Sequence, residues 1–70
     1  MLKAEFINKW FEVEEPSIIV TVTKLPSGAL ETQVNTDQLA EKYKYILENY
    51  DNAMALRRNP EVKIVGVIVA

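Results

Sequence analysis

The sequence contains neither cysteine nor histidine, and only two of its 70 residues are glycine. Without cysteine the chain can form no disulfide and no thiolate nucleophile, and without histidine it lacks the commonest general base and a frequent metal ligand. Two glycines are too few for a glycine-rich phosphate-binding loop, and no hydroxyl residue stands in a nucleophile-elbow pattern. We therefore expect no catalytic residue, no metal site and no cofactor, and we interpret the protein as non-enzymatic.

An excess of positive charge is also missing, because ten acidic residues outnumber eight basic ones and the formal net charge is −2. The only basic cluster is Arg57, Arg58 and Lys63, which offers little of the counterion release that drives nucleic-acid binding. Cations near the C-terminus of a helix also complement its dipole. A nucleic-acid partner is therefore disfavoured, and a weak nucleic-acid binder that uses these three residues is kept as an alternative.

Three carboxylates, Glu12, Glu14 and Glu15, lie close together in the sequence. Consecutive glutamates before a turn are usually solvated, and their spacing alone does not predict a hard-metal site or an acid/base pair. Together with Asp51 they define another alternative function. In it, the acidic side chains would replace the phosphates of a nucleic acid on a target enzyme and inhibit that enzyme.

Long apolar runs are absent, and none approaches the ~20 residues of a membrane span. The first ten residues carry Glu5 and Asn8 where a signal peptide would have an apolar block. We expect no membrane partner and no export, and the lack of cysteine fits the reducing cytoplasm. Length and composition predict one folded domain over residues 1–70.

The most regular pattern extends from Asn35 to Pro60 and predicts one long helix. Its apolar residues recur at steps of four and three, which places them on one helical face: Leu39, Tyr43, Ile46, Tyr50 and Ala53. Asn35 is expected to be the N-cap, with Gln38 three residues on, and Pro60 to close the segment. Short polar side chains at Asn49, Asp51 and Asn52 lower helix propensity, so a bend or break is expected there, with a separate short turn at 53–58.

Two segments, 18–24 and 30–34, have the β-branched and alternating patterns of strands, and Pro26 and Gly28 between them predict a hairpin turn. Segment 62–69 is the most apolar of the chain and is expected to be a central strand. Strict alternation assigns its apolar residues to two faces, with Val62, Ile64 and Ile68 on one and Val65, Val67 and Val69 on the other. A glycine inside a strand, here Gly66, indicates a bulge or a close backbone approach.

The first segment, 2–13, fits both a helix and a strand, and we favour a strand over 3–11 because of its aromatic residues and the absence of an N-cap. The resulting element order is β-β-β-α-β. This order predicts a small two-layer α+β sandwich with an antiparallel sheet of three to four strands and one long helix.

A single helix covers one face of a sheet, so one apolar face is left over. If segment 2–13 is a helix, it would cover that face from behind; if it is a strand, a second copy of the chain would. We therefore expect a homodimer, and another protein is a further possible partner. The predicted contact residues are Trp10, Phe11, Tyr45, Val65, Val67 and Val69. The function best matching these features is a small self-associating protein-interaction module, an accessory protein of the size found in bacteria and bacteriophages.

Overall fold

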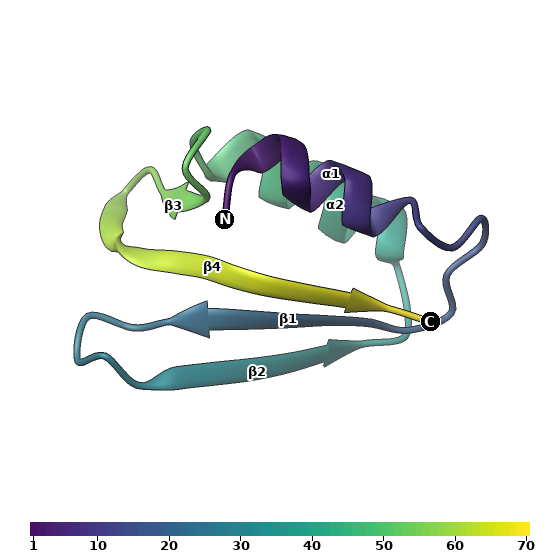
Figure 1. The fold of residues 1–70 in the computed structure, drawn as a ribbon, viewed down its shortest axis with the longest axis horizontal. Helices are drawn as coiled ribbons and strands as arrows, with labels where there is room; N and C mark the ends of the chain where they lie inside the picture. Colours follow the sequence, from purple (N-terminus) through teal and green to yellow (C-terminus); the bar gives the residue numbers. More distant parts are fainter.

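The computed structural model describes all 70 residues and contains two helices and four strands. Helix α1 spans Lys3–Trp10 and α2 Leu39–Asn49; the strands are β1 Ile19–Lys24, β2 Leu30–Asn35, β3 Ala55–Leu56 and β4 Asn59–Val69. The sheet order is β2-β1-β4-β3, and every neighbouring pair is antiparallel. Both helices lie on the same side of this sheet (Figure 1). The predicted two-layer α+β architecture with an antiparallel sheet is confirmed.

The N-terminal segment is a helix, so the predicted strand over 3–11 is wrong. Phe6 and Trp10, one helical turn apart, are both buried, and the Trp10 ring packs against Tyr43 of α2 in a tilted arrangement, with the ring centroids 5.1 Å apart. The backbone N–H of Leu2 donates to the Glu5 carboxylate at 3.0 Å, which ties down the first turn. Contacts with α2 thus selected one of the two patterns that the sequence allowed.

Helix α2 is shorter than predicted at both ends. Asn35 is the last residue of β2, where it pairs with Ile19, so it is not the N-cap. The N-cap is Gln38, whose φ of 52° places it in the left-handed region. The helix ends at Asn49, the weak point that the polar residues predicted, and the chain then forms the short strand β3 instead of a helical turn.

The hairpin between β1 and β2 has the predicted chemistry. Gly28 has a φ of +89°, a conformation that side chains disfavour, and its N–H donates to the Leu25 carbonyl at 2.8 Å. The Leu25 N–H in turn donates to the Ala29 carbonyl at 2.8 Å, which closes the turn.

Strand β4 is internal, as predicted, and it contains a bulge. Val22 of β1 pairs with Gly66, whereas the next residue, Thr23, pairs with Ile64, so Val65 is an extra residue on β4. Of the two features that Gly66 indicated, a bulge or a close backbone approach, the structure has a bulge directly beside the glycine, at Val65. Because of the extra residue, Ile64 and Val67 are both buried in one core while Ile68 is exposed, and the two faces assigned by strict alternation are wrong.

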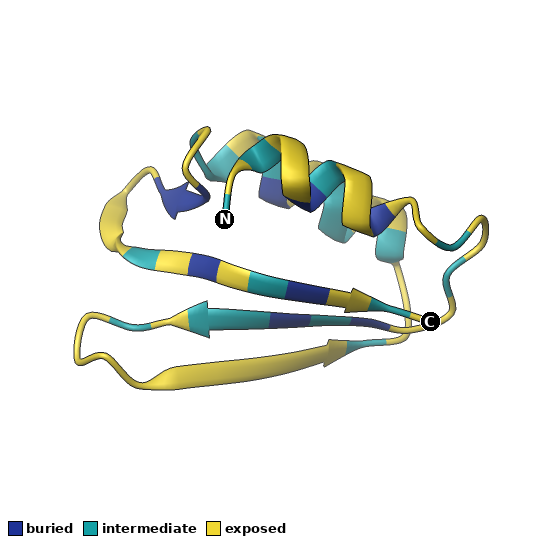
Figure 2. Cartoon of the chain, in the orientation of Figure 1, coloured by how far each residue is buried: buried dark blue, intermediate teal, exposed yellow.

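The core lies between the two helices and one face of the sheet. Figure 2 shows the buried residues in both helices, in β1 and β4, and on β3. Ile46 is buried, as the helical stripe predicted. The cluster combines residues from both helices, from β1 and β4, and from the loop before β3: Phe6, Trp10, Ile19, Ile46, Met54, Ile64 and Val67.

Candidate interaction surface

The sheet face turned away from the helices has no covering layer. Ile19 and Thr21 of β1 are buried towards the helices, so the alternate residues Val20 and Val22 point to the other side. The pairing of β1 with its neighbours extends this surface across three strands. We define the open face as Val20, Val22, Leu30, Thr32, Val34, Val65, Gly66 and Ile68.

Strand β2 shows most clearly that this face is apolar. Its alternation places Glu31 and Gln33 on the helix side, where the Lys42 ammonium donates to the Gln33 side-chain oxygen at 2.8 Å. Leu30 and Val34 consequently point away from the helices and are 64% and 62% exposed. Figure 2 shows almost the whole of β2 as exposed. The strand therefore presents its apolar side to the open face and its polar side to the helix layer.

The open face consists of cross-strand rows. One row is entirely aliphatic, with Val20 between its partners Val34 and Ile68, and Ile68 is 64% exposed. In the neighbouring row, Val22 lies between Thr32 and Gly66. The largest apolar patch on a typical soluble monomer is itself about 300–600 Å² and is often functional.

Gly66 leaves a gap near the middle of this face, which we name the Gly66 notch. Its φ is not in the left-handed region, so its backbone conformation does not require glycine. A Cβ added there would meet only the Val22 side chain, at 3.7 and 3.8 Å, which is ordinary van der Waals contact. Packing within one chain therefore does not explain the glycine either.

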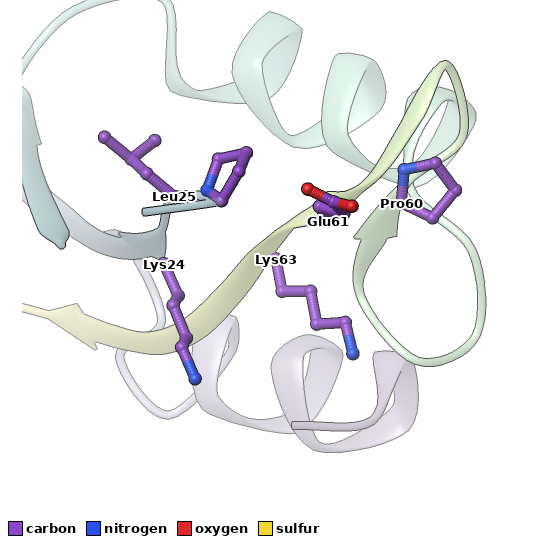
Figure 3. A pocket seen from close by; sticks show the side chains of 6 residues that line it. Lys24, Leu25, Pro60, Glu61 and Lys63 are labelled. Atoms are coloured by element: carbon purple, nitrogen blue, oxygen red, sulfur yellow. The ribbon is translucent and has the colours of Figure 1, made fainter. Parts of the chain in front are cut away.

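One end of the open face is charged. Lys24 and Lys63 are direct cross-strand partners, and their side chains extend in the same direction (Figure 3). They belong to an open hollow of about 420 Å³ that is lined by Lys24, Leu25, Pro26, Pro60, Glu61 and Lys63. At the opposite end of the sheet, the connections that enter β1 and leave β2 carry Glu14, Glu15 and Asp37. The sheet is thus basic at one end of the open face, and acidic residues lie in the connections at its other end.

The predicted contact residues are divided between the surface and the core. Phe11, Tyr45 and Val65 are 60%, 41% and 40% exposed, and of these three only Val65 lies on the open face.

Trp10 and Val67 are buried in the core and Val69 packs against it, so assigning these three to an interface was an error. The cause for the two valines is the bulge, which turns them towards the helices. Three exposed residues of the open face were not among the predicted contact residues: Leu30, Val34 and Ile68. The alternation of 30–34 was visible in the sequence, but the side of the sheet that its apolar residues occupy was not.

The other charged residues singled out in the sequence do not form one site. Glu12, Glu14 and Glu15 follow α1, whereas Asp51 follows α2 at the other end of the molecule (Figure 1). No three acidic side chains are grouped so that they could hold a metal ion. The basic trio is divided too, with Lys63 on β4 and the two arginines in the connection between β3 and β4.

Two side chains in the loop after α2 have shifted pKa values. The pKa of Asp51 is lowered, chiefly because the backbone N–H of Ala55 donates to its carboxylate at 3.0 Å; the N–H of Ala53 also donates, at 2.9 Å. The pKa of Tyr50 is raised, mainly by burial of its hydroxyl. Both shifts arise from the packing of this loop, away from the open face.

Neither helix has the length and apolar character of a membrane span. Comparisons with protein-family models, with curated proteins and with solved structures found no match to this chain.

Proposed function

We propose that this protein is a non-enzymatic protein-interaction module that binds its partner through the open face. The main evidence for this proposal is the orientation of the β2 side chains. The exposed Leu30 and Val34 face away from both helices. A strand that packed only within its own chain would direct such residues towards the core. Binding of a partner would remove this apolar surface from water, which is the main favourable contribution to association.

The partner is either a second copy of the chain or another protein, and we place the interaction in the cytoplasm. The surplus apolar face expected from the sequence is present, and α1 does not cover it, since α1 lies on the same side as α2 (Figure 1). Self-association therefore remains the mode of binding that the uncovered apolar face favours. Bacterial or bacteriophage origin is a further part of the proposal and rests only on the size and composition of the chain.

The proposal is tested by placing a charge on each side of β2. Val34→Lys puts an ammonium group on the open face, and Gln33→Lys puts the same group on the helix side one residue away. Both positions are exposed, so both variants should keep the circular dichroism spectrum of the wild type. Self-association is measured by sedimentation, and binding of other proteins by affinity capture from cell lysate.

We expect Val34→Lys to abolish association in whichever assay shows it for the wild type, and Gln33→Lys to retain it. If Val34→Lys associates as well as the wild type in both assays, the open face is not the binding surface and the proposal is wrong.

A further inference from the structure

Building on the proposed function, we infer that the partner is a second copy of the chain, packed face to face about a two-fold axis perpendicular to the strands. In this arrangement Ile68 of each copy fills the Gly66 notch of the other. Both residues belong to β4 and lie on the open face, in adjacent cross-strand rows. The contact is therefore reciprocal, as two-fold symmetry requires.

The glycine is the observation that points to a closely approaching partner. Neither its φ nor packing within one chain requires glycine at position 66. Glycine also weakens the interior of a strand compared with a β-branched residue, so its presence has a cost for the isolated chain. A side chain from a facing sheet explains the gap, and the most exposed aliphatic residue of β4, Ile68, has the shape to fill it.

The composition of the face favours a copy of the same chain over an unrelated protein. Apart from Thr32, Gly66 and the Lys24–Lys63 pair at one end, the residues of the open face are aliphatic, and none is aromatic. Interfaces between identical subunits are the more apolar ones, whereas other protein interfaces are enriched in aromatic residues and arginine. Aliphatic side chains on two facing sheets interdigitate as they do in the core of a β-sandwich.

The charges at the ends select the direction of packing. We consider a two-fold axis that lies in the plane between the two sheets and is perpendicular to the strands. Rotation about this axis reverses the strand direction of the second copy and places its β4 over the β4 of the first. The row that contains Ile68 then lies over the row that contains Gly66, and the Lys24–Lys63 end lies towards the acidic end of the other copy. An axis parallel to the strands would instead bring four lysines together, which repel one another even beside Glu61.

The size of the face predicts a weak and reversible dimer. Three strands spaced at ~4.8 Å, each with about six residues at ~3.3 Å per residue, cover roughly 300 Å² in projection. Stable interfaces usually bury about 800 Å² from each partner. We therefore expect dissociation in the micromolar range or weaker, so self-association must be measured at correspondingly high concentrations.

The decisive variant is Gly66→Val, which fills the notch with a side chain that one chain can accommodate. The monomer should keep its fold and its thermal stability, since the added Cβ makes only ordinary contacts with Val22. The dimer should be weakened, with a dissociation constant raised by about tenfold or more, because Ile68 of the partner no longer has room. Sedimentation equilibrium measures this constant, and Gln33→Lys is the control that leaves it unchanged.

A second variant tests the contact between the two residues. Ile68→Ala removes the side chain that enters the notch, and it should weaken the dimer on its own. When it is combined with Gly66→Val, the new valine occupies the space that isoleucine has left, so the double variant should dimerise better than Gly66→Val alone.

Three results would overturn the inference. An unchanged dimer in Gly66→Val, or strictly additive effects in the double variant, would exclude the contact between Ile68 and the notch. A wild type that stays monomeric at every concentration would exclude the second copy as partner. In that last case, loss of another protein's binding in Val34→Lys would still support the proposed function, so the two failures can be told apart.

Discussion

Lys3 connects the two helices through an interaction that the sequence pattern does not reveal. Its ammonium group donates to the carbonyls of Leu47, at 2.9 Å, and of Tyr50. These carbonyls belong to the last turn of α2 and its C-cap, where a helix has no backbone donors left and where its dipole favours a cation. Lys3 therefore caps a helix from which it is separated by more than forty residues.

Replacing Lys3 with Met should leave those carbonyls without a donor while it preserves the length of the side chain. We expect the free energy of unfolding to fall by about 1.5–3 kcal/mol, as for other hydrogen bonds that involve a charged group. Urea denaturation measures the change. Lys9→Met, at an exposed position of the same helix, is the control and should cost much less; equal losses in the two variants would argue against the capping role.

Asp51 makes the stability of the molecule depend on pH. Its carboxylate accepts the N–H groups of Ala53 and Ala55, so its pKa is lowered from the ordinary value of 3.8. A lowered pKa means that the folded state binds this proton less readily than the unfolded state. The resulting stabilisation is present above the unfolded-state pKa and is lost as the pH falls through the folded-state pKa.

Asp51→Ala should therefore lower the melting temperature at neutral pH, and the difference from the wild type should shrink as the pH is brought below 3.8. Thermal melts across the acidic range measure this difference. Asp37→Ala is the comparison, because it removes an exposed carboxylate that accepts no backbone hydrogen bond. A difference for Asp51→Ala that stays constant down to the lowest pH would contradict this account.

Among the elements, those marked by a strong local signal were predicted, whereas the form of the N-terminal segment and the start of the second helix were not. The hairpin of β1 and β2, the central position of β4 and the end of the second helix near Asn49 all follow from local sequence. Each depends on a signal that acts within a few residues: β-branching, a Pro–Ser–Gly turn, or short polar side chains that weaken a helix.

The remaining features depend on contacts between distant parts of the chain. The form of the first segment was decided by packing of Phe6 and Trp10 against the rest of the core. The pairing of β4 with β1 decided which side chains of β4 face the core, because β4 has an extra residue, Val65, in this pairing. The open face could be expected as a surplus from the sequence, but its members could not, because one bulge reverses the assignment of several side chains.

Helix α1 should contribute a large share of the stability, which the strand interpretation would not explain. Phe6 is 0% exposed, so Phe6→Ala should cost about 3–5 kcal/mol. Total stabilities of single domains are only ~5–15 kcal/mol, so this variant should be close to unfolding. Phe11→Ala, which truncates an exposed ring at the end of the same helix, is the control. Urea midpoints that fall equally would show that α1 does not pack as described.

At the scale of the whole molecule, a small core is combined with an exposed apolar face on one side of the sheet. Only ten of the 70 residues are buried. A chain of this size buries a smaller fraction of its surface than a larger domain does, and its stability as a monomer is correspondingly modest. If the open face is closed by a second copy, association and folding are coupled, and the folded state gains stability from mass action.

This coupling predicts that the melting temperature of the wild type rises with protein concentration. The increase should be a few degrees for each tenfold change once most chains are paired, because domains of this size shift by several degrees for each kcal/mol. Val34→Lys should melt at one temperature throughout the same range. Differential scanning calorimetry at several concentrations makes the comparison, and a wild-type midpoint independent of concentration would rule the coupling out.

The bulge in β4 has a consequence for how the length of this chain can vary in evolution. Without Val65, Thr23 would still pair with Ile64 and Val22 with Gly66, now in an uninterrupted ladder, so no other side chain would change sides. If a residue were lost elsewhere in the inner part of the strand, every side chain that follows it would move to the opposite face of the sheet. Core side chains would then face the solvent, and exposed ones would face the core. Insertions and deletions in β4 that preserve the fold should therefore concentrate at this one site.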